Sequence, residues 1–222
     1  MSYCGVNVKS NPEQAEFARL ICENNRPIIF CEGAAGTGKS LVAIAVALEL
    51  KMMKKYNQLY YTRTPIQVGP QMGFLPGDAD EKTYPYMAPL MDSINSICRI
   101  NNKRYNEKEL LAKFEVIPVA FVRGRNLEGL TIVDEAQNLS MMEIQTLCTR
   151  VGEYGKIIFM GSVKQIDNPV QKKKDKCDFQ KAYEALQERL PGSVGFIHLE
   201  KSMRSPWCAA VDEIFEDLKK ED

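Results

Sequence analysis

Histidine and tryptophan are nearly absent from this sequence, because His198 and Trp207 are the single examples of each in 222 residues. The seven cysteines are odd in number, and no two of them form a C-x-x-C pair. Zinc sites and disulfide frameworks need paired or clustered ligands, so the sequence argues against both. We expect reduced, mostly buried thiols, a core or sheet-edge position for His198, and a structural role for Trp207.

An excess of charge and a long apolar run are missing as well. Twenty-nine acidic residues balance twenty-nine basic ones, which argues against broad electrostatic coating of nucleic acid and leaves room only for a local basic groove. The longest apolar stretch, Leu41–Leu50, contains a glutamate and is too short to span a bilayer, and the first nine residues are too polar for a signal peptide. We expect a cytoplasmic protein with no membrane partner.

The length of 222 residues suits one domain with a full core. We expect a single domain over residues 1–222, with segment 1–10 and tail 219–222 at its periphery.

Strand-like apolar runs alternate with helical patterns along the chain. Helices are expected after Asn11-Pro12-Glu13, over Leu41–Leu50, over Ser140–Val151 with Ser140 and Glu143 as a capping box, and from Trp207 to Leu218. Strands are expected at Pro27–Cys31, Gln58–Thr62, Phe114–Ala120, Leu130–Val133, Lys156–Gly161 and Gly192–Leu199. This alternation predicts an α/β fold, with a mostly parallel sheet flanked by helices.

Two segments carry no periodic pattern and are expected to be irregular. Pro65–Pro89 is rich in proline and glycine and contains Phe74, Tyr84 and Tyr86, which could line a pore, stack on single-stranded nucleic acid or simply pack against a second subunit. Asp167–Lys176 contains the lysines 172–174, which form either a solvated loop or a contact with a phosphate backbone.

A glycine-rich turn follows the first expected strand and precedes a helix. Its residues Gly33, Ala34, Ala35, Gly36, Thr37, Gly38, Lys39 and Ser40 match G-x-x-x-x-G-K-[ST] without deviation. Glycines let backbone N–H groups curl around a phosphate, and the helix N-terminus adds partial positive charge. Lys39 can reach the β- and γ-phosphates while the Ser40 hydroxyl binds Mg²⁺, so the motif predicts an ATP site.

Asp134 and Glu135 end the apolar run Leu130–Val133. At the carboxyl end of a strand, Asp134 would face the glycine-rich turn and hold Mg²⁺, and Glu135 would orient or deprotonate the attacking water. The alternative is a pair of solvated acids that open a helix, but the intact glycine-rich turn argues against it. The acidic pair also favours hydrolysis over phosphate transfer to a small acceptor.

Several stretches together resemble the PhoH family of ATPases. They are Gly33–Ser40, Gly73-Phe74-Leu75-Pro76-Gly77-Asp78, Glu81-Lys82, Arg123-Gly124-Arg125-Asn126-Leu127, Asp134-Glu135-Ala136-Gln137-Asn138, Gln165-Ile166-Asp167 and Met203-Arg204-Ser205-Pro206. The resemblance extends from about Gln14 to Asp217 and implies a RecA-like P-loop NTPase fold, similar to the first core domain of superfamily 1 helicases.

The resemblance also implies roles for single residues. Gln14 would read the adenine edge, although it could equally be an ordinary exposed helix residue, and Gln165 would sense the γ-phosphate. The family usually has Gly-Asp before this glutamine, whereas Gly161-Ser162 stands here. A hydroxyl therefore replaces a carboxylate, which affects sensing and coupling more than nucleotide binding.

Phosphoryl transfer needs positive charge beyond Lys39 and Mg²⁺. Arg204 matches the family's late arginine and is the first candidate, followed by Arg63, Arg123 and Arg125. Because a single RecA-like domain is expected, the arginine should come from a neighbouring subunit. This predicts a homo-oligomer, most simply a hexameric ring.

The function expected is Mg²⁺-dependent ATP hydrolysis coupled to single-stranded RNA or DNA, with Lys39, Glu135, Gln165 and Arg204 as the catalytic residues. Two other functions use the same motifs. ATP could hold together a scaffold or regulatory ring, an alternative that Ser162 keeps open. A nucleotide kinase would transfer phosphate to an acceptor, and the Asp134-Glu135 pair argues against it.

Overall fold

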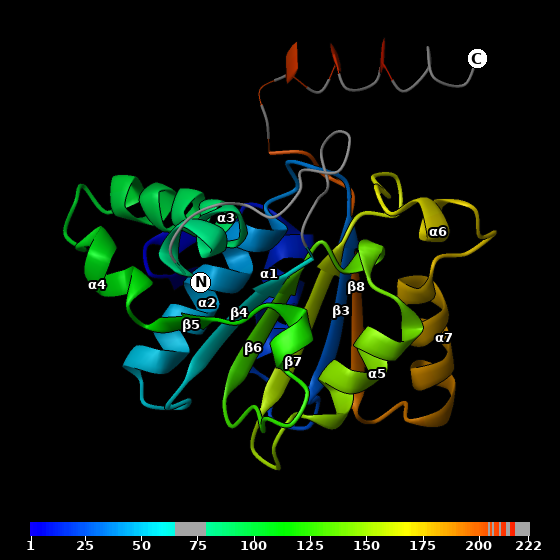
Figure 1. Cartoon of the computed structure of the whole chain (residues 1–222). Coiled ribbons are helices and arrows are strands. Elements are labelled where there is room, and N and C mark those ends of the chain that lie inside the picture. The colour runs from blue at the N-terminus through cyan, green and yellow to red at the C-terminus, as the bar shows by residue number, and fades with distance from the viewer. Residues whose placement is uncertain (65–78, 204, 206, 209, 212–213, 216–222) are drawn as a thin grey trace.

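A computed structural model describes residues 1–64, 79–203, 205, 207, 208, 210, 211, 214 and 215 (Figure 1). Its centre is a sheet of six strands in the order β5-β4-β6-β7-β3-β8, with every neighbouring pair parallel. The strands are β3 (Ile28–Gly33), β4 (Leu59–Arg63), β5 (Phe114–Val116), β6 (Leu130–Asp134), β7 (Lys156–Gly161) and β8 (Val194–Leu199). The predicted α/β fold with a parallel sheet is confirmed.

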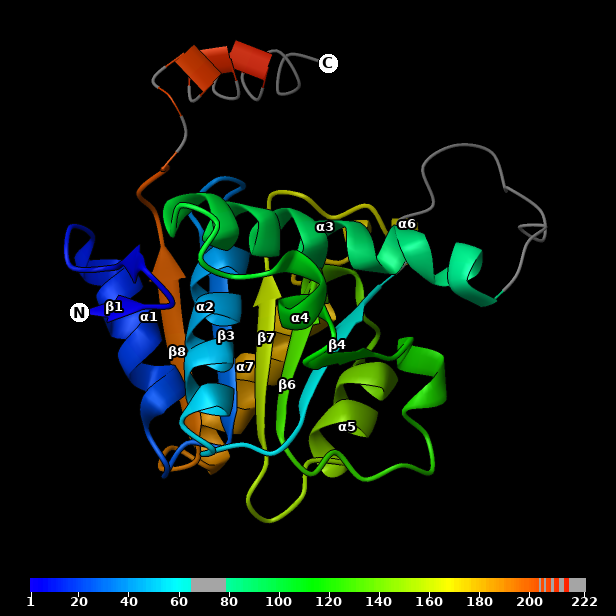
Figure 2. The ribbon, with the colours of Figure 1, turned by 90° about the vertical axis from the view of Figure 1, so that its left-hand side faces the viewer.

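Helices cover both faces of this sheet. Figure 2 shows α1 (Pro12–Cys22), α2 (Lys39–Met52) and α3 (Ala79–Ile100) in front of the strands and α7 (Asp178–Arg189) behind them. The helix α5 (Met141–Thr149) packs beside α7, and the short α4 (Glu107–Leu111) packs beside α3. None of the described helices has the length and apolar character needed to cross a membrane.

The core has one layer on each side of the sheet because alternate strand residues point to opposite faces. In β3, Ile29 and Cys31 join the layer under α1 and α2, whereas Phe30 stacks on Phe159 in the layer under α7. The helix α2 buries eight residues, as its apolar sequence predicts. The parallel sheet is thus covered on both faces, as such sheets usually are.

Helix ends follow the capping signals of the sequence. The Asn11 side chain accepts hydrogen bonds from the backbone N–H groups of Glu13 and Gln14 at the start of α1. Ser140 and Glu143 form the predicted capping box at the start of α5.

The segments expected to be irregular contain helix, so that prediction is wrong in part. The helix α3 includes Ala79–Pro89, and α6 (Pro169–Lys172) forms one turn within Asp167–Lys176. Leu90, Ile94 and Ile97 are fully buried at helical spacing, so packing against α2 outweighs the helix-breaking tendency of proline. Residues 65–86, which include Phe74, Tyr84 and Tyr86, lie outside the residues whose side chains are described.

Two boundaries predicted from the sequence are also corrected. The strand expected at Phe114–Ala120 ends at Val116, and Pro118, which has no N–H to donate, precedes the 3-10 turn η1 (Val119–Phe121). The segment 1–10, expected at the periphery, instead contributes four buried side chains to the core. Tyr3, Cys4 and Val6 come from the hairpin of β1 (Ser2–Tyr3) and β2 (Val6–Asn7), and Val8 follows it.

The described residues of the closing helix are helical, and all of them except the partly buried Cys208 are exposed. Trp207 is 70% exposed, so it does not have the structural role expected of it. His198 lies on the edge strand β8, as expected.

Candidate active site

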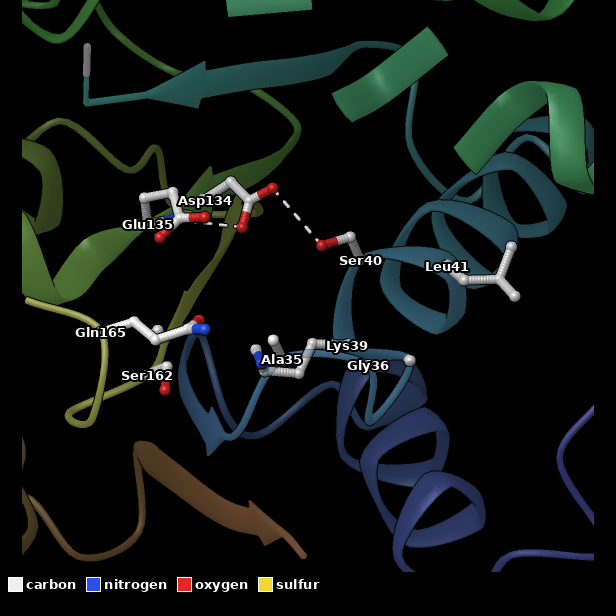
Figure 3. A pocket seen from close by; sticks show the side chains of 11 residues that line it. Ala35, Gly36, Lys39, Ser40, Leu41, Asp134, Glu135, Ser162 and Gln165 are labelled. Atoms are coloured by element: carbon white, nitrogen blue, oxygen red, sulfur yellow. Dashed lines mark hydrogen bonds between the residues drawn. The ribbon is translucent and has the colours of Figure 1, made fainter. Parts of the chain in front are cut away.

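A cavity of about 260 Å³ opens at the carboxyl edge of the sheet, where β3, β6 and β7 end. Figure 3 shows side chains from the glycine-rich turn on one side and from the ends of β6 and β7 on the other. The residues lining the cavity are Ala35, Gly36, Gly38, Lys39, Ser40, Leu41, Asp134, Glu135, Gly161, Ser162 and Gln165. Residues more than 120 positions apart therefore share one site, because parallel strands end at the same edge.

The glycines of the turn are required by its backbone. Gly36 and Gly38 have φ angles of 77° and 87°, which residues other than glycine rarely adopt. At Gly33, a Cβ atom would lie 2.6 Å from the backbone oxygen of Leu199. The chain can curl in this way only with glycine at these positions.

Lys39 begins α2 and its ammonium lies against the turn. Its Nζ donates to the backbone oxygens of Gly33 at 2.6 Å and Ala34 at 2.8 Å. Burial lowers the pKa of Lys39, and the neighbouring carboxylates of Asp134 and Glu135 act in the opposite direction. The structure thus holds a positive charge where a phosphate chain would enter the turn.

Asp134 is 6% exposed and receives hydrogen bonds from three sides. Its Oδ2 accepts from the Ser40 hydroxyl at 3.3 Å and from the Tyr61 hydroxyl at 2.9 Å, and its Oδ1 accepts from the backbone N–H of Glu135 at 3.0 Å. A hydroxyl and a carboxylate oxygen side by side are ligands that Mg²⁺ prefers. The donor set of Ser40 and Asp134 therefore fits a magnesium ion.

Glu135 has left-handed backbone angles, with φ 55° and ψ 38°, which places it at a tight bend after β6. Its Oε2 accepts from the Gln137 amide at 2.6 Å, and its Oε1 lies 3.6 Å from the Arg63 guanidinium. Burial, and then the charge of Asp134, raise the pKa of Glu135, whereas Gln137, Arg63 and Lys39 lower it. A partly buried carboxyl group at a strained bend, held from both sides, is typical of a catalytic position.

Two further residues, named from the sequence only as part of a family stretch and without a role, organise the site. Gln137 is fully buried, donates to the Gln165 backbone oxygen at 2.8 Å, and accepts from the Ser162 N–H at 3.1 Å. Asn138 accepts from the backbone N–H groups of Asp167 and Asn168 at 2.8 and 2.9 Å. Their position directly after the two acids was the available signal.

Gln14 is buried beside the glycine-rich turn and does not line the cavity. Its Nε2 donates to the Thr37 backbone oxygen at 2.9 Å, and a Cβ at Gly38 would lie 2.5 Å from that nitrogen. Gln14 is thus no exposed helix residue, and its contact with adenine stays a prediction.

The candidate arginines lie in different places. Arg63 is close to Glu135, whereas Arg125 pairs with Glu115 at 2.6 Å and Arg123 donates to the Met142 sulfur at 2.9 Å, both on an exposed surface. Arg204 lies outside the described residues, although the preceding Met203 N–H donates to the Gly36 backbone oxygen at 2.8 Å.

The fold and the site together define a class of protein. The glycine-rich turn follows β3, and the two acids lie at the end of β6. In the sheet, β7 lies between these two strands. A P-loop with one strand inserted before the strand that carries the acids is the arrangement of RecA-like P-loop NTPases.

The chain belongs to the PhoH family, because the family's profile, described as "PhoH-like protein", matches residues 7–216. It is 36% identical over 171 residues to Protein PhoH2 of Bacillus subtilis, covering 74% of this chain and 38% of that protein. A PhoH-like protein of Synechocystis is 32% identical over 206 residues, covering 91% of this chain and 60% of its own length. Protein PhoH of Escherichia coli is 33% identical, covering 72% of this chain and 45% of the relative.

These relatives are longer proteins, since the chain spans between 38% and 60% of their length. Among solved structures, the Pif1 helicase of Candida albicans matches with a TM-score of 0.39 and 14% identity, over 86% of this chain and 39% of that one.

Asn138→Ala tests the anchoring of the loop after β7. We expect the backbone N–H groups of Asp167 and Asn168 to lose their acceptor, which costs about 0.5–1.5 kcal/mol of unfolding free energy for each hydrogen bond. Hydrogen exchange measured by mass spectrometry should speed up over residues 162–168.

Asn106→Ala is the matched control, because the Asn106 side chain also accepts from two backbone N–H groups, those of Lys108 and Glu109 in α4. It should speed exchange in α4 alone. Unchanged exchange over residues 162–168 in Asn138→Ala would contradict the anchoring role.

Proposed function

We propose that this chain binds ATP with Mg²⁺ and hydrolyses it. The observation that carries the proposal is the shared cavity, in which the P-loop lysine and serine face the two acids that end β6. The Ser40 hydroxyl donates to Asp134 Oδ2 at 3.3 Å, which supports a single site built from the P-loop and the acids.

The P-loop backbone, Gly33 to Ser40, would wrap the phosphates, and Lys39 would leave its two backbone acceptors to contact the β- and γ-phosphates. Ser40 and Asp134 would hold Mg²⁺, which would neutralise part of the negative charge of the phosphates. Burial makes these charges more effective than they would be in water.

Glu135 would orient the attacking water and accept its proton. Its raised pKa favours proton acceptance, and the contacts from Gln137 and Arg63 fix the direction of its carboxylate. Gln165 lines the cavity opposite the P-loop and would sense the γ-phosphate. The Gln137 amide that contacts Glu135 also donates to the Gln165 backbone oxygen, so one side chain links the two positions.

We propose a homo-oligomer, with a hexameric ring as the leading arrangement and Arg204 completing the site of a neighbour. Among the described arginines, Arg63 already faces its own chain's Glu135, so it supplies charge within the subunit. A monomer in light scattering, with and without an ATP analogue, would contradict the ring.

We also propose that hydrolysis is coupled to single-stranded RNA or DNA in the cytoplasm. This step rests on the family resemblance alone, because fold does not determine function. The balanced net charge implies that any nucleic-acid contact is local.

The second candidate is an ATP-dependent scaffold with weak hydrolysis. Ser162 favours it, because this residue is 4% exposed and brings a hydroxyl to the cavity where the family usually has a carboxylate. A scaffold would bind nucleotide and assemble, yet release little phosphate.

Glu135→Gln should separate hydrolysis from binding. The amide keeps the size of the side chain but cannot accept a proton, so we expect phosphate release to fall at least about 100-fold, within the range of general-base effects. Nucleotide affinity, measured by calorimetry, should change little.

Glu153→Gln, an exposed change in the turn before β7, is the control and should hydrolyse ATP normally. Equal phosphate release from Glu135→Gln and the unaltered protein would contradict a catalytic role for Glu135, and little release from either protein would leave the scaffold as the better account.

Single-stranded RNA and DNA should raise the ATPase rate of the unaltered protein if hydrolysis drives motion on either. Equal rates with RNA, with DNA and with neither would leave an ATPase without nucleic-acid coupling. Steady-state phosphate release in these three conditions provides the measurement.

A further inference from the structure

Tyr61 is a buried residue of β4 that belongs to none of the sequence motifs, yet its hydroxyl reaches the site. The side chain is fully buried, and its ring packs in the core layer under α2 with neighbours such as Leu59 and Ile132. Its hydroxyl donates to Asp134 Oδ2 at 2.9 Å. The ring is therefore part of the core, while its polar end contacts the acid.

The register between β4 and β6 creates this contact. Arg63 lies opposite Asp134 and Tyr61 lies opposite Ile132, so Tyr61, Arg63 and Asp134 all point to the same face of the sheet. This is the face that α2 covers, and Ser40 is in the first turn of that helix. A shift of one residue would turn the hydroxyl to the opposite face.

The Asp134 carboxylate is held by three donors from three parts of the chain. Tyr61 and Ser40 donate to Oδ2, and the Glu135 N–H donates to Oδ1. Of these, Ser40 is itself a proposed ligand, and the Glu135 N–H belongs to the strained bend. The Tyr61 hydroxyl is the donor that has no other part in the site and comes from a rigid strand.

We propose that Tyr61 is a positioning residue that fixes the Asp134 carboxylate for binding Mg²⁺. The inference rests on the proposed function, because it assigns Asp134 to the metal. Partners of metal ligands commonly set their orientation, and removing them typically weakens metal affinity about 10- to 100-fold. Tyr61 meets that description through a single hydrogen bond to one ligand.

The Tyr61 phenol has one O–H to donate, and Asp134 Oδ2 accepts it. Phenylalanine at this position would keep the ring and its packing while removing the donor.

Tyr60 provides a matched control in the same strand. It is 8% exposed, points to the opposite face and packs in the other core layer. Tyr60→Phe and Tyr61→Phe therefore each remove one hydroxyl from a neighbouring, mostly buried tyrosine, and only the second touches Asp134.

The test measures binding and does not depend on turnover. A non-hydrolysable ATP analogue is titrated by calorimetry across a series of Mg²⁺ concentrations, and bound Mn²⁺ is followed by electron paramagnetic resonance. For Tyr61→Phe we expect the metal concentration for half-maximal effect to rise about 10-fold. Analogue affinity without metal should stay within about 2-fold for both variants, since the P-loop is unchanged.

A double-mutant cycle with Asp134→Asn tells positioning from general packing. If Tyr61 acts through Asp134, Tyr61→Phe should cause no further loss of metal affinity in the Asp134→Asn protein. Equal losses in both backgrounds, or an unchanged metal dependence in Tyr61→Phe, would overturn the inference and leave the proposed function standing. If analogue binding by the unaltered protein did not depend on Mg²⁺, both the role of Tyr61 and the proposed function would be overturned.

Discussion

The contact between Ser40 and Asp134 is the constraint on which the site depends, because it joins the P-loop helix to the strand that carries the acids. The contact exists since β3 and β6 are parallel and end at the same edge, with β7 between them. Packing on both faces of the sheet holds that register, because a slip of one residue would move Ile132 into the other core layer and turn Asp134 away from Ser40. Hydrophobic packing thus determines where the charged groups meet.

The buried amide side chain of Gln137 links the acids after β6 to the end of β7. Gln137 contacts Glu135, Ser162 and Gln165, so the water-orienting and phosphate-sensing positions share one partner. The close approach of Gly161, where a Cβ would lie 2.9 Å from Gln137 Oε1, leaves room for no larger residue. We therefore expect a substitution after β6 to alter the positions of residues after β7, and the reverse.

The sequence predicted the sheet, the P-loop and the acid pair, because each has a local signature at fixed spacing. It could not predict α3, since Pro85 and Pro89 signal a break and the burial of Leu90 and Ile94 depends on α2. Tyr61, Arg63 and Gln137 could not be assigned their contacts for a related reason. Apart from the Gln137–Glu135 contact, their partners lie far along the chain, and only the strand order brings them together.

The central claim is that the P-loop and the two acids form one ATP site, and Lys39→Ala tests it most directly. Isothermal titration of a non-hydrolysable ATP analogue with Mg²⁺ should show affinity falling at least about 10-fold, since a buried charge-assisted contact is lost. Thermal unfolding should confirm that the variant remains folded. Undiminished affinity in folded Lys39→Ala would contradict the account.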